Sequence, residues 1–161
     1  RINELNLKFN CIYMNELYFL GQVVLAAALG AVLGWQRERW GKSAGHRKYA
    51  LVAAGSALFT ILSIYGFGGM SESSRVASQI VIGIGFLGAG IIFQKENHIE
   101  GLTTAAGLWT TAAIGMAVGV RYFVLAAGTT FIIFLLLAID DSRFRMKKNE
   151  CVNNGDGNGK G

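Results

Sequence analysis

The densest set of ionisable side chains lies in one short segment, residues 37–48. It contains Arg37, Glu38 and Arg39, followed by Arg47 and Lys48. A basic cluster beside an apolar run either attracts anionic lipid headgroups or forms a docking surface for a protein or an anion. If the cluster is a docking surface, we expect Glu38 to pair with Arg47 and to hold the segment close to the bilayer.

Few other residues could carry out chemistry. The two histidines, His46 and His98, belong to no recognisable nucleophile, zinc or P-loop motif. Glu96, His98 and Glu100 alternate and could form a weak divalent-cation site, but we interpret them as a solvated loop. Residues 83–88 match G-x-G-x-x-G, but they lie in an apolar run without the preceding strand that a dinucleotide fold requires. We therefore expect no catalytic residue, no cofactor and no metal site.

Five long stretches without a charged residue must position these side chains. Each has at least 18 residues, which is enough to cross a hydrocarbon core of about 30 Å as a helix. Charged residues make up only 16% of the chain, whereas soluble domains average about 25%. The sequence predicts an all-α membrane protein, a polytopic bundle of five transmembrane helices. The predicted spans are 17–35, 49–69, 76–93, 102–120 and 122–139.

The distribution of Lys and Arg predicts the orientation of this bundle. The segments after the first, third and fifth spans carry 11 of these residues, and the remaining segments carry 4. Because cytoplasmic segments are enriched in Lys and Arg, we expect the N-terminus outside and the C-terminus inside. Charges that flank apolar runs in this way argue against nucleic acid as the partner. The predicted parts are an extracytoplasmic segment 1–16, not necessarily functional before Met14, a transmembrane domain 17–139, and a basic, disordered cytoplasmic tail 140–161.

Small and polar residues within the spans indicate how the helices meet. Glycine allows close helix packing, so we expect Gly85 and Gly115 on packed faces and Ile132 toward lipid. A second interpretation is that the third span breaks around 83–90 and exposes backbone carbonyls to a polar pathway. The packing candidates are Gly30, Gly34, Gly83, Gly85, Gly88, Gly90, Gly107, Gly115 and Gly119, and the interhelical or pathway candidates are Gln22, Gln79, Thr103 and Thr104.

The residue types that are missing from the predicted spans also bear on function. None of the five contains Asp, Glu, His, Lys or Arg. Proton-coupled carriers usually need an ionisable relay, and pathways for divalent cations usually need carboxylates. The sequence therefore disfavours a self-sufficient ion pump or carrier.

Four segments carry a more specific pattern: Leu-Gly-Trp-Gln-Arg-Glu-Arg at 33–39, Gly-His-Arg-Lys-Tyr-Ala-Leu-Val at 45–52, and the glycine-rich stretches 75–93 and 101–115. In this order and at this spacing they resemble the MgtC/SapB family of bacterial membrane proteins, over about residues 17–139. Members usually carry Thr where this chain has Lys48, and longer members have a soluble C-terminal domain after the membrane part.

The resemblance implies a multi-pass protein of the bacterial inner membrane that is linked to magnesium homeostasis, growth at low magnesium and, in pathogens, virulence. It also implies effects on ATP synthase or membrane potential. We expect a non-enzymatic regulator or adaptor in the lipid bilayer, with ATP synthase or a transporter subunit as its membrane partner, and homo-oligomers are compatible with this. The alternative is a transporter or channel subunit for magnesium or another small solute, with the third span lining the path.

Overall fold

A computed structural model describes residues 2–42, 44–66, 70–95 and 98–155, and it describes side chains within 15–42, 44–66, 74–94 and 99–139. The described chain is helical apart from one small hairpin between the third and fourth helices. The helices are α1 (Ile2–Arg39), α2 (His46–Tyr65), α3 (Met70–Ala89), α4 (Leu102–Gly119) and α5 (Phe123–Gly155), and the strands are β1 (Phe93–Lys95) and β2 (His98–Glu100). The strands pair antiparallel, with Gln94 opposite Ile99.

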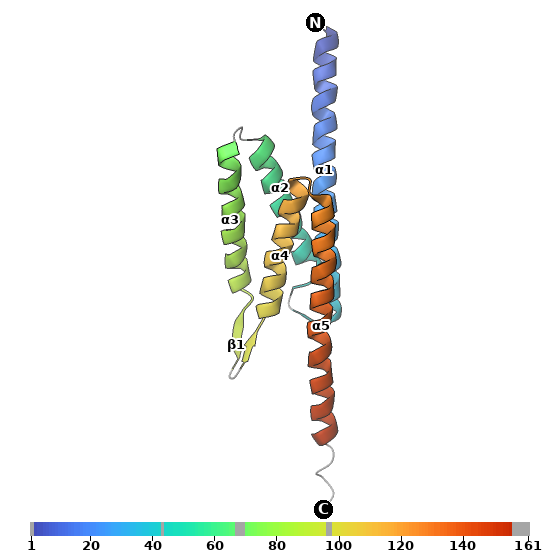
Figure 1. The fold of residues 1–161 in the computed structure, drawn as a ribbon, viewed down its shortest axis with the longest axis vertical. Helices are drawn as coiled ribbons and strands as arrows, with labels where there is room; N and C mark the ends of the chain where they lie inside the picture. The colour runs from blue at the N-terminus through green and yellow to red at the C-terminus, as the bar shows by residue number, and fades with distance from the viewer. Residues whose placement is uncertain (1, 43, 67–69, 96–97, 156–161) are drawn as a thin grey trace, which may run out of the picture.

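The helix axes are roughly aligned with one another, and the chain passes up and down along them, so that its two ends lie at opposite ends of the molecule (Figure 1). α1 and α5 are the longest helices and extend beyond the bundle in opposite directions. α2 packs against both α1 and α4, whereas α3 lies at the periphery and packs mainly against α4 and α2. This arrangement makes α2 the central element of the bundle.

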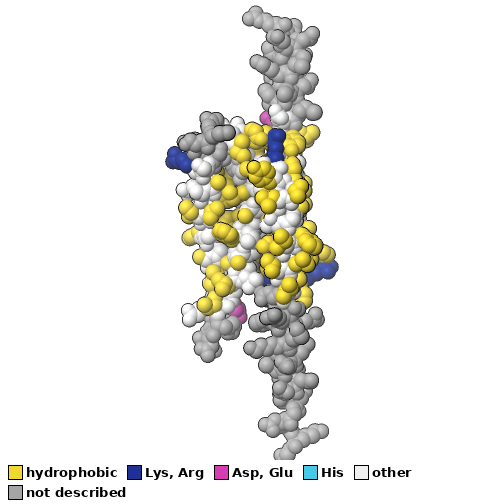
Figure 2. All heavy atoms as spheres, viewed as in Figure 1, with side chains coloured by type: hydrophobic (Ala, Val, Ile, Leu, Met, Phe, Trp, Pro, Cys, Tyr) yellow, Lys and Arg dark blue, Asp and Glu magenta, His cyan; other side chains and the backbone are white. Residues whose placement is uncertain are grey.

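The surface has the polarity of a membrane protein. Three helical segments are long and apolar enough to cross a bilayer, Asn15–Arg39, His46–Tyr65 and Leu102–Gly119, and Ser74–Ala89 and Phe123–Ile139 form shorter apolar helices. Figure 2 shows hydrophobic side chains over the middle of one face, with Lys and Arg toward its two ends. Large apolar side chains point outward, with Phe86 82% exposed and Val124 89% exposed.

The core, in contrast, is built largely from small residues. Alanines 26, 53, 57 and 126 are fully buried, together with Tyr49 and Leu33. Lipid is as apolar as a protein core, so small residues at helix interfaces stabilise a membrane bundle by allowing close contact between backbones. This explains why the large hydrophobic side chains are outside and the alanines are inside.

Helix boundaries differ from the predicted spans at several places. α3 spans Met70–Ala89 rather than 76–93, so that Phe93 belongs to β1 and not to the third helix. α1 continues past Trp35 to Arg39, so that the charged residues 37–39 belong to the helix. α5 continues as helix beyond the predicted end of the fifth span at 139, as far as Gly155; residues 156–161 of the predicted tail lie outside the described part. Strong helix formers such as Arg, Met, Lys and Glu in 143–150 account for this continuation, because their intrinsic helix propensity outweighs the lack of apolar residues to bury.

The interpretation of the third span as a broken helix is not supported. α3 runs without interruption through the glycines to Ala89, and the Gly90 amide still donates to the Phe86 carbonyl at 3.2 Å. The chain then enters the hairpin and reaches α4 through Gly101, which has a φ of 91°. A Cβ at Gly101 would overlap the carbonyl oxygen of Ile91, so only glycine fits this close turn.

Candidate functional site

A buried arginine lies where the ends of three helices meet. Arg37, in the last turn of α1, is only 1% exposed. Its Nη2 donates a hydrogen bond of 3.0 Å to the hydroxyl oxygen of Thr104, in the first turn of α4. Arg37 was predicted to belong to a cytoplasmic docking surface, and this is wrong because its guanidinium points into the bundle. Thr104, predicted as an interhelical polar residue, lies in contact with it.

Tyr49 completes this buried polar cluster from the first turn of α2. Its side chain is fully buried, and its hydroxyl donates to the Thr104 carbonyl at 3.4 Å. Gly107 makes room for that hydroxyl, since a Cβ there would lie 2.5 Å from the Tyr49 oxygen. The cluster therefore joins α1, α2 and α4 at the end of the bundle where the basic segment lies.

Gln36 extends the cluster to α5. Its Nε2 donates a 3.0 Å hydrogen bond to the Phe134 carbonyl, and the side chain is 6% exposed. The candidate residues chosen from sequence include neither Gln36 nor Tyr49. A signal was available, because Ala26, Gly30, Leu33 and Arg37 recur at helical spacing on one face of α1, and Gln36 is nearly one turn beyond Leu33.

Glu38 anchors the segment that joins α1 to α2. Its Oε2 accepts a 3.2 Å hydrogen bond from the backbone amide of His46 and contacts the His46 Nδ1 atom. Gly45, at the helix boundary, supplies no side-chain cap, so Glu38 satisfies an amide at the start of α2 and places a negative charge there. The expected partner was Arg47, but the direct side-chain contact of Glu38 is with the imidazole of His46. The spacing explains this, because His46 is the first residue of α2 and its amide faces back toward α1.

The remaining basic side chains of the segment form an accessible surface, which we call the basic rim: Arg39, Lys42, Arg47 and Lys48. Arg39 stacks its guanidinium on the ring of Trp35, 3.8 Å from the centroid. Arg47 and Lys48 are exposed, and Lys42 is half-buried. Unlike Arg37, these residues present positive charge outside the bundle.

The predicted packing glycines divide into two groups. Those on α1 and α4 press against α2: a Cβ would lie 2.6 Å from the Tyr49 carbonyl oxygen at Gly30 and 2.8 Å from the Thr60 Cβ at Gly119. Gly34 and Gly107 are equally close to the start of α2, and a Cβ at Gly115 would overlap the Ala53 carbonyl oxygen. Neighbouring helices therefore touch α2 on two sides.

The glycines of α3 behave differently. At Gly83 and Gly85 no atom lies within 4 Å of the position that a Cβ would take, and Gly90 meets only carbonyls of its own helix end. Gly88 alone faces α4, with the Ala105 Cβ at an ordinary 3.5 Å. The expectation that Gly85 lies on a packed face is wrong, because α3 turns that face away from the bundle.

The other polar candidates are dispersed. Gln22 is 3% exposed within α1, and neither its amide nitrogen nor its amide oxygen has a hydrogen-bond partner among the described residues. Gln79 and Thr103 are exposed. In the alternating trio, Glu96 lies outside the described residues, the side chain of His98 is likewise not described, and Glu100 is exposed at the end of β2. Ile132 is 57% exposed on α5.

Comparison with known proteins covers the whole of this site. The family model described as "MgtC family" matches residues 23–144, which include Arg37, Tyr49, Thr104 and Phe134. The chain belongs to the MgtC family. No solved structure gives a significant match.

Three relatives illustrate the similarity. YhiD of Escherichia coli K12, whose name provisionally describes a magnesium transporter, is 41% identical over 81% of this chain and 65% of its own length. SrpB of Synechococcus elongatus is 37% identical over 80% of each chain. MgtC of Brucella abortus is 44% identical over 71% of this chain and 48% of its own length. The chain thus spans less than two thirds of YhiD and about half of the Brucella protein.

In this MgtC-family chain the groups of the buried cluster serve to hold helices together by hydrogen bonds. Its guanidinium donates to a threonine hydroxyl, and its tyrosine hydroxyl and its amide each donate to a backbone carbonyl. Within the described side chains, no group of three or more His, Cys, Asp or Glu could hold a metal ion. The cluster can therefore fix the relative positions of four helices and leave the basic rim outside.

Proposed function

We propose that this MgtC-family chain is a multi-pass inner-membrane protein with five spans, its N-terminus outside and its C-terminus in the cytoplasm. The excess of Lys and Arg around the basic rim and after residue 139 supports this orientation. The positions of the two chain ends at opposite ends of the bundle agree with an odd number of crossings (Figure 1). The shorter apolar segments Ser74–Ala89 and Phe123–Ile139 lie alongside the three longer ones and would complete the five.

Within that membrane the chain acts in magnesium homeostasis as a non-enzymatic regulator or adaptor. The magnesium-related name of YhiD supports the physiological setting. The observation that carries the regulatory role is the buried Arg37, a fixed positive charge held between α1, α2 and α4. Such a charge repels a divalent cation at short range, and the apolar runs of the sequence contain no carboxylate to offset it. Magnesium also gives up its hydration water reluctantly.

The partner binds at the basic rim. Arg39, Arg47 and Lys48 are exposed at one end of the bundle, so they attract an acidic surface of a neighbouring membrane protein. ATP synthase or a transporter subunit is the partner that fits the resemblance. Because this attraction is electrostatic, it weakens as ionic strength rises.

Two measurements test the role. Purified chain in liposomes that enclose a magnesium-sensitive dye should give no more magnesium influx than empty liposomes. In cells that depend on this chain for growth at low magnesium, the double substitution Arg39→Ala with Arg47→Ala should abolish growth while the protein still inserts and accumulates. The control removes a cation from the other end of the bundle, Arg121→Ala in the turn between α4 and α5, and should leave growth unchanged.

A second candidate function is a transporter or channel subunit, and an outward glycine of α3 favours it. Gly85 leaves backbone accessible on the face of α3 that points away from the bundle, which could line a path between several copies. Magnesium influx that scales with the amount of protein, and that survives loss of the two rim arginines, would establish this function and refute the regulator.

A further inference from the structure

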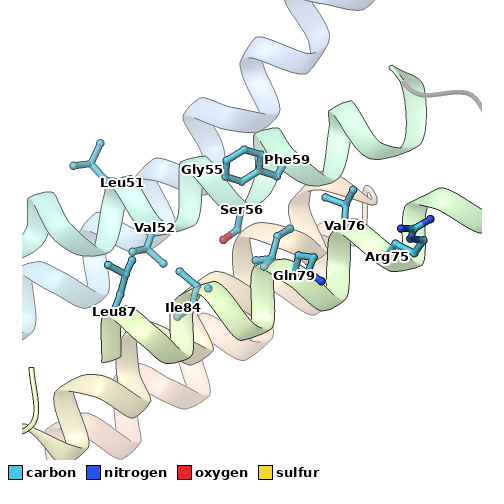
Figure 3. A pocket seen from close by; sticks show the side chains of 12 residues that line it. Leu51, Val52, Gly55, Ser56, Phe59, Arg75, Val76, Gln79, Ile84 and Leu87 are labelled. Carbon is cyan, nitrogen blue, oxygen red and sulfur yellow. The ribbon is translucent and has the colours of Figure 1, made fainter. Parts of the chain in front are cut away.

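A long groove separates α2 from α3 (Figure 3). Its volume is about 780 Å³, and it is lined from one side by α2 residues such as Val52 and Phe59 and from the other by α3 residues such as Ile84 and Leu87. Two glycines, Gly55 and Gly83, keep it open, because neither has an atom within 4 Å of the position of a Cβ. The groove opens sideways from the bundle, where lipid would surround the protein.

The groove has the length of a lipid chain. Its α3 wall extends from Arg75 to Leu87, roughly 18 Å at 1.5 Å per residue. One leaflet contributes roughly 15 Å of a 30 Å hydrocarbon core. Arg75 lies at the start of the apolar segment Ser74–Ala89, so this end of the groove lies at the membrane boundary.

The polarity of the lining changes along the groove. Arg75 and Gln79 lie together at one end, and Leu51 and Leu87 lie at the other (Figure 3). Between them the lining is apolar apart from Ser56. A guanidinium and an amide can both donate hydrogen bonds to phosphate oxygens, whereas the leucine end offers only apolar contact. This is the complement of a negatively charged headgroup attached to a hydrocarbon chain.

We propose that the groove between α2 and α3 binds an anionic glycerophospholipid, with its phosphate at Arg75 and Gln79 and one acyl chain along Gly55 and Gly83. The site is independent of whether the chain regulates or transports. Water cannot fill an apolar groove at membrane depth favourably, so an acyl chain is the natural occupant. The charge of Arg75 adds the preference for an anionic headgroup, because a cation near anionic lipid contributes about fivefold in affinity, the equivalent of about 1 kcal/mol.

Native mass spectrometry of the full chain tests the proposal. The chain in detergent is mixed with equal amounts of phosphatidylglycerol and phosphatidylcholine, and the lipid that stays bound is measured after the detergent is removed in the spectrometer. The native chain should retain phosphatidylglycerol about fivefold more than phosphatidylcholine. Arg75→Gln should make retention of the two lipids equal. Arg121→Gln removes a cation from the turn between α4 and α5, at the same end of the bundle, and should keep the preference. Equal retention by the native chain, or equal loss with both substitutions, would overturn the headgroup assignment.

A second variant tests the acyl-chain part. Gly83→Leu puts a side chain into the groove at a position where nothing lies within 4 Å of the Cβ, and it should reduce bound lipid of both kinds. Gly128→Leu on α5 is the matched control, because that glycine is equally open and lies outside the groove. If Gly83→Leu left lipid retention unchanged and instead converted an oligomer to a monomer, the groove would be an interface between copies and the lipid proposal would be wrong.

Discussion

Arg37 and Arg39 show how two residues in one turn of helix acquire opposite roles. Arg37 shares the inward face of α1 with Ala26, Gly30 and Leu33, and its guanidinium reaches Thr104. Arg39 is two positions further, about 200° around the helix, so it points outward and stacks on Trp35. Their charge predicts that both lie at the membrane edge. Only their positions around the helix decide that Arg37 points inward and Arg39 outward.

We expect Arg37→Ala to destabilise the folded chain by about 1–3 kcal/mol, because it removes a buried charge-assisted donor and leaves Thr104 without that donor. Arg39→Ala should cost under about 1 kcal/mol, since it removes an exposed cation–π contact. Unfolding in detergent, followed by tryptophan fluorescence, measures both. Equal losses for the two variants would contradict the assignment of Arg37 to the core.

Glu38 gives a second test at this scale. Glu38→Gln keeps the shape of the side chain but weakens its bonds to the amide and ring of His46. Backbone amides at the start of α2 should then exchange faster with deuterium, while Glu16→Gln, at an exposed position on the same helix, should leave their exchange unchanged. Unchanged exchange in the Glu38 variant would mean that the carboxylate does not cap α2.

The residue scale also shows where sequence reasoning reached its limit. The basic cluster and Thr104 could be identified from their types and positions, but their contacts could not. Tyr49 and Gln36 give little signal on their own, because a tyrosine in an apolar run and a glutamine at a helix end are both common. Their roles follow from tertiary contacts with Gly107 and Phe134, residues far along the chain.

At the scale of elements, the five charge-free runs predicted the five helices, because an apolar run of this length in lipid must satisfy its own backbone hydrogen bonds. The hairpin of β1 and β2 was missed. Its strands have three residues each, too short for an alternating pattern to stand out from a polar loop.

The two groups of glycines make a prediction at this scale. Gly115→Leu should prevent folding or assembly, because a side chain there would collide with the Ala53 backbone, and backbone cannot move aside cheaply. Gly85→Leu should be tolerated like Ile132→Leu, since both positions face outward. The yield of monodisperse protein after detergent extraction is the measurement. Similar yields for the two glycine variants would show that the Gly85 face of α3 packs against a further protein surface in the membrane.

At the scale of the whole molecule, the testable feature is the placement of the chain ends. If the bundle crosses the membrane five times, Cys11 and Cys151 lie on opposite sides. A membrane-impermeant maleimide applied to spheroplasts, whose inner membrane is intact, should label Cys11 and not Cys151. After the inner membrane is permeabilised, both cysteines should be labelled. Labelling of both in intact spheroplasts would overturn the topology and the charge argument behind it.

The peripheral position of α3 has a consequence for cooperativity. α1, α2 and α4 are joined by glycine contacts and by the buried cluster, whereas α3 meets α2 across an open groove and packs on α4 through a small apolar cluster. We therefore expect two units that differ in their free energy of local unfolding. α3 with its hairpin should detach at a lower free energy, while the other helices stay folded. Hydrogen exchange of α3 amides, measured in detergent where lipid protection is reduced, should be fast and independent of exchange in α2.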